Sequence, residues 1–339
     1  MNLSNNILRE FLISYRIKCL VFCFSLLVFT NVVTPLWSAN LHLLSIAEKA
    51  EDRNETTWIS KDNTIRIPLK RAGRLLYLEA IVDGVSGNLI LDTGAPGLVL
   101  NKSYFRDYEP VYQTETGGIT GSTGMLYRKW IDSLYLGAIT FHTLKTSLVD
   151  LGHIENKRGL KVIGLLGVDV LKDFAFLINL KANYIDLYVL NSDGEPLAEL
   201  PFKLANTKTI PVNYYHDLIC LKLEIGGKKM SVCFDTAAEM SFLDSRLPKR
   251  AMKQIRIERK VNLVGAGAHQ KEVLLGKVNR VQFNEFEIID FPVLLGSFGA
   301  MNEAYGSHLK GMLGFDFMEQ GELLINLKKK QLWIIPFKR

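Results

Sequence analysis

The chain is poor in the residues that build metal and redox sites. It has four cysteines and six histidines among 339 residues. There is no Cys-x-x-Cys pair, and the histidines do not have metal-ligand spacing. These absences exclude the common zinc and thioredoxin-like sites, so neither a metal nor another cofactor is expected. Since Cys19 and Cys23 lie in an apolar N-terminal run, only Cys220 and Cys233 remain for the rest of the chain.

Charge and glycine patterns exclude several further classes. The net charge of +6 is too small to indicate a nucleic-acid partner. Ser122 lies in Gly-Ser-Thr-Gly, which is not the Gly-x-Ser-x-Gly elbow of serine hydrolases. The stretch Gly265-Ala266-Gly267 lacks the third glycine of a dinucleotide site. Both glycine-rich stretches are better interpreted as turns.

The N-terminus has the pattern of an export signal. Basic residues precede an apolar run at 19–33, and its 15 residues are few for a membrane span. We therefore expect residues 1–39 to be a signal peptide cleaved near Ala39, or an uncleaved membrane anchor. The expected location is the periplasm, or the membrane with the chain facing the periplasm or the exterior. Residues 40–60 are expected to be a spacer.

One short phrase occurs twice in the chain. Residues 89–95 read Leu-Ile-Leu-Asp-Thr-Gly-Ala, and residues 232–238 read Val-Cys-Phe-Asp-Thr-Ala-Ala. In each copy an apolar strand leads into Asp-Thr-small-Ala. Asp235 lies 143 residues after Asp92. Two such aspartates from related halves of a chain can face each other across one axis.

A second pair of blocks extends the duplication. Residues 164–171, Gly-Leu-Leu-Gly-Val-Asp-Val-Leu, resemble residues 311–318, Gly-Met-Leu-Gly-Phe-Asp-Phe-Met, 147 positions later. Each half therefore holds the same parts in the same order. The predicted boundaries are a first lobe at 61–190, a linker at 191–209 and a second lobe at 210–339.

Short strands with turn signals predict an all-β protein built from two barrel-like lobes. Asp83-Gly84 and Gly226-Gly227 are hairpin turns in this interpretation. Residues 116–124 are too rich in glycine for a packed element and are expected to form a mobile turn. A short helix is expected between Gly167 and Phe174.

The turn at Gly226-Gly227 fixes a cross-strand pairing. In a two-residue hairpin it places Cys220 opposite Cys233. A disulfide and a simple packing pair both remain open, because the first copy has Tyr77 and Ile90 at the matching positions.

These motifs resemble the retropepsin-like (pepsin/retropepsin) aspartic protease family, in a tandem two-lobe single-chain form of bacterial type. The resemblance covers residues 61–339. It rests on Asp92-Thr93-Gly94-Ala95 and on the later Leu165-Leu166-Gly167 and Met312-Leu313-Gly314. It implies the acid protease fold, with two homologous closed β-barrel lobes and a cleft between them. It also implies a Gly-rich flap from each lobe, with Gly117, Gly118 and Gly121 in the first and Gly265 and Gly267 in the second.

The resemblance implies that Asp92 and Asp235 are catalytic. Two close carboxylates share a proton, so one can take a proton from water while the other polarises a peptide carbonyl. Thr93 and Thr236 would interlock beneath them, and Gly94 would let the backbone approach the carboxylates. The implied function is an exported aspartic endopeptidase with a polypeptide substrate. Since both lobes lie in one chain, a monomer is sufficient for the dyad.

Ala237 departs from the family pattern, because glycine is expected there. If that position requires a positive φ, the strain is about 1–2 kcal/mol, which affects catalytic geometry more than folding. The alternative function is therefore a catalytically impaired pseudo-protease that binds extended peptides.

Overall fold

The computed structural model describes residues 55–58, 62–107, 113–118, 121–204, 207–215, 218–264, 270–304 and 306–337. The predicted signal or anchor at 1–39 lies outside the described residues, as does most of the predicted spacer. The last part of that spacer is a strand, β1, which pairs with the first lobe. Among the described residues, no helix is both long enough and apolar enough to span a membrane.

The first half of the chain is built mainly from strands. Its elements, in chain order, are β1 (Glu55–Trp58), β2 (Thr64–Pro68), β3 (Lys70–Ala72), β4 (Leu75–Val82), β5 (Val85–Leu91), β6 (Leu98–Asn101), β7 (Gln113–Gly118), β8 (Gly121–Leu136), β9 (Ile139–Val149), α3 (Gly152–Arg158), β10 (Val162–Leu166), α4 (Val168–Leu171), β11 (Phe174–Asn179) and β12 (Tyr184–Val189).

The second half repeats this order. Its elements are β13 (Lys208–Tyr215), β14 (Leu218–Ile225), β15 (Lys228–Phe234), β16 (Phe242–Asp244), α5 (Lys249–Met252), β17 (Ile255–Val264), β18 (Gln270–Phe283), β19 (Phe286–Gly296), α6 (Gly299–Ala304), β20 (Gly311–Leu313), α7 (Phe315–Met318), β21 (Gly321–Asn326) and β22 (Gln331–Pro336).

Each half closes a barrel with the same strand order. In the first half the path β9-β6-β10-β5-β4-β8 closes because β8 pairs with β9. In the second half the path β19-β16-β20-β15-β14-β18 closes because β18 pairs with β19. The strand that leads to each aspartate, β5 or β15, pairs in parallel with the strand at the start of the second block, β10 or β20. The predicted pair of closed barrels is confirmed.

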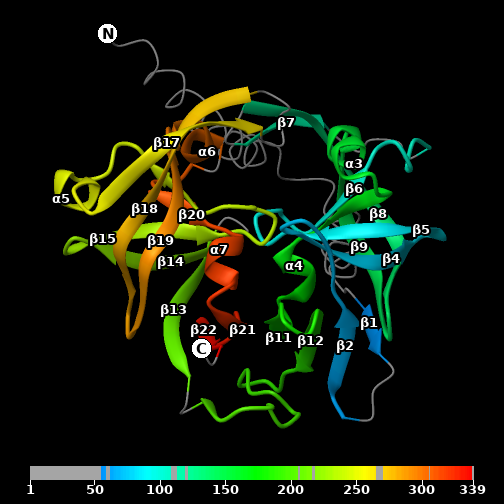
Figure 1. The fold of residues 1–339 in the computed structure, drawn as a ribbon. Coiled ribbons are helices and arrows are strands. Elements are labelled where there is room, and N and C mark those ends of the chain that lie inside the picture. The colour runs from blue at the N-terminus through cyan, green and yellow to red at the C-terminus, as the bar shows by residue number, and fades with distance from the viewer. Residues whose placement is uncertain are drawn as a thin grey trace, which may run out of the picture. The chain divides into compact units, whose positions relative to one another are not determined.

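A shared sheet joins the two halves. Strands β2, β12 and β11 of the first half continue through β21, β22 and β13 of the second half. Residues Ala175 to Ile178 of β11 pair with Leu323 to Asn326 of β21 across the junction. In Figure 1 this sheet lies at the bottom of the view, with α4 and α7 above it and the β7 and β17 hairpins at the top.

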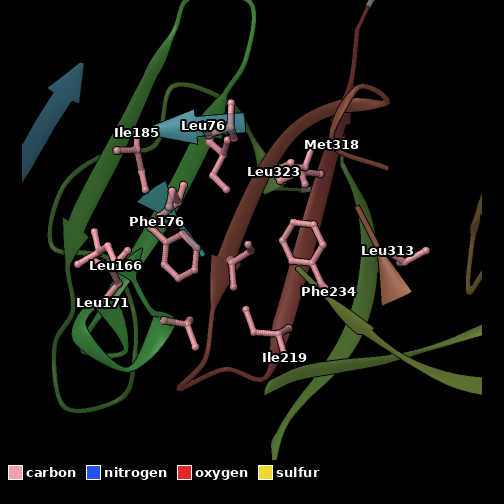
Figure 2. Close-up of a cluster of buried hydrophobic side chains, with 14 of the residues drawn as sticks. Leu76, Leu166, Leu171, Phe176, Ile185, Ile219, Phe234, Leu313, Met318 and Leu323 are labelled. Carbon is pink, nitrogen blue, oxygen red and sulfur yellow. The ribbon is translucent and has the colours of Figure 1, made fainter. Parts of the chain in front are cut away.

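The main hydrophobic core crosses the junction between the halves. One continuous cluster of buried side chains includes Ile65 and Phe176 of the first half together with Phe234 and Ile325 of the second. Figure 2 shows Phe176 and Phe234 among the side chains of this cluster. Because both halves contribute to one core, neither half buries all of its apolar surface alone.

The predicted hairpins form with the expected register. Asp83 and Gly84 both have positive φ, as the turn between β4 and β5 requires. Gly226 and Gly227 do the same between β14 and β15, and Cys220 lies directly opposite Cys233. Both thiols are free, so this structure contains the cross-strand packing pair and not the disulfide.

The glycine-rich stretch at 116–124 is more regular than predicted. Residues up to Gly118 belong to β7, those from Gly121 belong to β8, and Gly118 pairs with Gly121. Glycine offers no side chain for packing, but its N–H and C=O still form ladder hydrogen bonds when a partner strand is present. The interpretation of this whole stretch as a mobile turn was therefore wrong.

Candidate active site

Both aspartates occupy the same position in their lobes. Asp92 directly follows β5, and its N–H donates to the carbonyl of Leu166 at 3.0 Å. Asp235 directly follows β15, and its N–H donates to the carbonyl of Leu313 at 2.9 Å. The apolar residues before each aspartate form a buried strand end, so each carboxyl is held at the edge of a rigid sheet.

Two threonines tie the loops together across the junction. The Thr93 N–H donates to Thr236 Oγ1 at 3.0 Å, and the Thr236 N–H donates to Thr93 Oγ1 at 3.0 Å. Each hydroxyl then donates to a carbonyl of the other lobe: Thr93 to Phe234 at 2.9 Å and Thr236 to Leu91 at 2.7 Å. Both threonines are fully buried. The predicted interlock is present in both directions.

The carboxyl groups of Asp92 and Asp235 meet above this interlock. They lie side by side: a Cβ built on Gly94 would be 2.9 Å from Asp235 Cγ and 3.2 Å from Asp92 Oδ1. Asp92 Oδ1 also accepts from the N–H of Gly94 at 2.9 Å. Asp235 Oδ1 accepts from the N–H groups of Ala237 at 2.8 Å and Ala238 at 3.2 Å. Counted over the whole residue, Asp92 and Asp235 are partly exposed.

The environment of the pair favours one shared proton. Burial raises the pKa of Asp92 well above its ordinary range, and the negative charge of Asp235 raises it further. Burial also raises the pKa of Asp235, but the N–H donors of Ala237 and Ala238 oppose that shift. Asp235 Oδ1 accepts two backbone N–H groups where Asp92 Oδ1 accepts one, so these hydrogen bonds favour the anion on Asp235.

Gly94 and Ala237 occupy equivalent positions in the two loops, but the space available for a side chain differs between them. Neither residue has a positive φ, so the backbone strain considered for Ala237 does not arise. A Cβ on Gly94 would lie 2.9 Å from Asp235 Cγ and 3.2 Å from Asp92 Oδ1. Ala237 packs against an apolar cluster of the first lobe that includes Leu75. A side chain is thus tolerated at Ala237, whereas Gly94 has no room for one.

The second blocks support the loops through close backbone contacts. The Gly167 N–H donates to Gly97 O at 2.7 Å, and a Cβ on Gly167 would lie 2.2 Å from that same oxygen. A Cβ on Gly314 would lie 2.5 Å from Ala238 O. Only glycine fits at these two positions, which explains the repeated apolar-apolar-Gly pattern. The short helices α4 and α7 follow directly, as predicted.

The predicted flap residues are only partly within the described chain. Gly117, Gly118 and Gly121 lie at the end of the β7–β8 hairpin, and β7 lies near α6 of the second lobe. Gly265 and Gly267 fall outside the described residues. In the part of the chain that the structure describes, no group of three or more His, Cys, Asp or Glu side chains is arranged to hold a metal ion.

Sequence reasoning missed several polar residues around the second loop. Arg74, Arg158, Glu239, Ser241 and Asp316 form hydrogen bonds next to Asp235. Asp316 belongs to a repeated block, but the repeat itself gave no role for its carboxyl. The two arginines have no counterpart in the repeat, so no pattern in the sequence pointed to them.

Both halves of the chain are similar to a known protein family. A family model described as "Aspartyl protease" matches residues 78–170 and again residues 221–317. Among solved structures, a retropepsin-like aspartic protease from Rickettsia conorii matches with 21% sequence identity, covering 40% of this chain and 94% of that chain, with a TM-score of 0.29. No curated protein matches the chain. Because the family model covers more than half of the sequence, once in each repeat, the chain belongs to the aspartyl protease family.

Proposed function

We propose that the chain is an exported aspartic endopeptidase that hydrolyses peptide bonds with a water molecule activated between Asp92 and Asp235. The observation that carries this proposal is the carboxyl pair itself. Two aspartates from different lobes lie side by side, and reciprocal threonine bonds fix the loops that bear them. Family membership supports a peptide hydrolase in general terms.

The two aspartates take different roles in this proposal. Asp235, whose Oδ1 accepts two backbone N–H groups, is the ionised member and removes a proton from the bound water. Asp92 holds the shared proton and donates a hydrogen bond to the substrate carbonyl oxygen. The water oxygen then attacks the carbonyl carbon, and no covalent enzyme intermediate forms. The proton that Asp235 took from the water then passes to the amide nitrogen, the C–N bond breaks, and an amine and a carboxylic acid are released.

The raised pKa values of the pair predict hydrolysis in the acid range. Activity requires one proton on the dyad, so it is lost at low pH when both carboxyls are protonated and at higher pH when both are ionised. The substrate is an extended polypeptide between the lobes.

Hydrolysis of an unfolded protein across the acid range tests the proposal. The full chain is compared with Asp92→Asn and Asp235→Asn, and Asp290→Asn is the control because Asp290 is an exposed aspartate that pairs with Arg256 on the surface of the second lobe. We expect both dyad variants to lose activity and the control to keep it. Activity that persists in a dyad variant contradicts the mechanism.

The second candidate is a peptide-binding pseudo-protease, and Ala237 in place of glycine is the residue that favours it. The same assay distinguishes the two candidates. A wild-type chain that cleaves nothing but binds a peptide with a hydroxyl in place of the scissile carbonyl is a binder. Cleavage that this compound inhibits identifies an endopeptidase.

Export rests on the apolar run at 19–33 and is tested separately. We propose that the lobes lie in the periplasm, either free or anchored through this run. A reporter enzyme that is active only outside the cytoplasm, fused after residue 60, is expected to be active. Sequencing the N-terminus of the exported chain distinguishes a cleaved signal from an anchor, and a silent reporter contradicts export.

A further inference from the structure

Side chains of the first lobe form hydrogen bonds with the loop that follows Asp235 in the second lobe. Arg74 lies in the turn between β3 and β4, and its Nη1 donates to Asp316 Oδ1 at 2.8 Å and to Glu239 O at 3.1 Å. Arg158, on α3, donates through Nη2 to Glu239 Oε1 and through Nη1 to Ala72 O at 3.3 Å. Glu239 is therefore held at its backbone by one arginine and at its carboxylate by another.

Asp316 connects Arg74 to the rest of the loop. Its side chain is only 1% exposed, and its Oδ2 accepts from the Ser241 N–H at 2.9 Å. The Ser241 hydroxyl accepts from the Gly314 N–H at 3.0 Å, and Ala238 O accepts from the Phe315 N–H at 2.8 Å. Each of these bonds fixes a residue between Asp235 and β16, so Arg74 acts on a stiff segment.

The residues that make this contact are not repeated in the other half of the sequence. At the matching positions of the repeat, Arg74 corresponds to Asp217 and Arg158 to Tyr305, neither of which is a cation. Glu239 corresponds to Pro96, which has no carboxylate. Asp169, the counterpart of Asp316, pairs with Lys172 of its own helix at 3.0 Å. The duplicated fold therefore does not by itself produce the contact, which is a feature of the second loop.

The contact lies next to the backbone N–H groups that donate to the Asp235 carboxylate. The N–H groups of Ala237 and Ala238 both donate to Asp235 Oδ1, and Glu239 is the next residue. A loop released at Glu239 moves these donors away from the carboxylate. In the first loop, the carbonyl of Gly97 likewise accepts from the Gly167 N–H of its own lobe.

We propose that Arg74 and Arg158 are positioning residues that hold the Asp235 loop in its catalytic geometry through Glu239 and Asp316. This inference rests on the proposed function, since the geometry at stake is that of the dyad. The residues form a contact between lobes in which the first lobe sets the geometry of the aspartate in the second. They do not touch the substrate in this proposal.

The pH profile separates positioning from simple structural support. Losing the N–H donors disfavours the Asp235 anion, and the loss of the arginine charge acts in the same direction, so the acid limb of kcat/KM moves to higher pH. The other ionisable groups facing this region are Asp92 across the dyad, Cys233 on β15 and Glu319 beside Arg74. None of these groups is altered in the variants below, so they leave the direction of the shift unchanged.

The test compares Arg74→Gln, Arg158→Gln and the double variant with wild type. We expect kcat to fall about 10- to 100-fold, KM to change less than about threefold, and the acid limb to move to higher pH. The variant that combines Arg158→Glu with Glu239→Arg forms the same ion pair with the charges exchanged. We expect it to recover part of the kcat that Arg158→Gln loses. Arg66→Gln is the matched control, because Arg66 also binds a buried carboxylate, that of Asp186, within the shared sheet.

Amide hydrogen exchange in a peptide spanning 235–241 gives a readout that does not require activity. We expect faster exchange in the arginine variants and no change in Arg66→Gln. If wild type hydrolyses nothing, the proposed function fails, and the exchange data still decide whether the arginines hold the loop. An unchanged kcat, pH profile and exchange rate in the double variant would overturn the inference, as would equal effects in Arg66→Gln.

Discussion

At the scale of single residues, the difference between Gly94 and Ala237 carries the most information. The sequence suggested that Ala237 impairs catalysis, because the equivalent residue in the first copy is Gly94. In the structure, the position that cannot accept a side chain is Gly94 and not Ala237. The φ angle of Ala237 is not positive, whereas a Cβ at Gly94 would lie 2.9 Å from the Asp235 carboxylate. A single sequence reports which residues differ between the copies, but it does not report the dihedral angles or the free space around them.

Two single substitutions, Gly94→Ala and Ala237→Gly, test this interpretation. Gly94→Ala is expected to lower kcat about 100-fold or more, because the new methyl group displaces the Asp235 carboxylate. Ala237→Gly is expected to change kcat less than about threefold and to lower stability by about 1 kcal/mol or less. Steady-state kinetics and thermal unfolding of both variants provide the measurement. A large gain in activity for Ala237→Gly would mean that the natural residue impairs the site.

The raised pKa of Asp92 also predicts a pH-dependent stability. Burial and the charge of Asp235 raise this pKa in the folded chain, so the folded state holds a proton that the unfolded state releases. The contribution of Asp92 to stability is therefore greatest in acid and declines as pH rises from its unfolded pKa to its folded pKa. Asp92→Asn removes this penalty at neutral pH.

The melting temperature of Asp92→Asn is thus expected to exceed that of wild type at about pH 7 and to match it at about pH 3, where aspartates of the unfolded chain are protonated. Each kcal/mol relieved corresponds to about 2–4 °C. Calorimetry at both pH values provides the comparison. A lower melting temperature for the variant at neutral pH would show that the carboxylate stabilises the fold.

At the scale of elements, the two Asp-Thr loops work as one unit. Their threonine hydroxyls each donate one hydrogen bond and accept another across the lobes, and all of these groups are buried. A buried backbone group that loses its partner costs about 1–3 kcal/mol. The interlock therefore stabilises the junction as well as placing the aspartates.

Thr236→Val tests the interlock, because valine keeps the shape but loses the hydroxyl. The change leaves Thr93 N–H and Leu91 O without partners and is expected to lower the free energy of unfolding by about 2–5 kcal/mol. Thr236→Ser keeps the hydroxyl and is the control, with an expected loss below about 1.5 kcal/mol. Denaturant unfolding measures both variants. Equal losses in the two would assign the effect to packing rather than to hydrogen bonds.

Local patterns predicted most elements, and the exceptions have physical reasons. The turns at Asp83-Gly84 and Gly226-Gly227 set the register of their hairpins, including the pairing of Cys220 with Cys233. Residues 116–118 were misjudged because a partner strand outweighs the low strand preference of glycine. Arg74 and Asp316 are 242 residues apart, so no local pattern connected them.

At the scale of the whole molecule, two lobes share one core. The sheet that crosses the junction contains strands from both halves, and the largest hydrophobic cluster does the same. The repeated blocks predicted the duplication and the placing of both aspartates in equivalent loops. They did not predict the one-way contact from Arg74 and Arg158, since it breaks the symmetry of the repeat. We propose lobe boundaries at 61–190 and 210–339.

The shared core predicts cooperative unfolding. Because the lobes bury apolar surface against each other, we expect one calorimetric transition for the chain rather than two. Intrinsic fluorescence and far-ultraviolet circular dichroism are expected to report the same midpoint. Two separate transitions, one for each lobe, would contradict the shared core as the main source of stability.

The central claim is that Asp92 and Asp235 act as one catalytic unit, and the additivity of their replacements tests it most directly. The measurement is kcat/KM for Asp92→Asn, Asp235→Asn and the double variant on one peptide substrate. Residues that act as a unit give equal losses, so each single variant is expected to lose roughly a thousandfold or more and the double variant no more than either. A single variant that retains most of its activity, or losses that multiply in the double variant, would contradict the account.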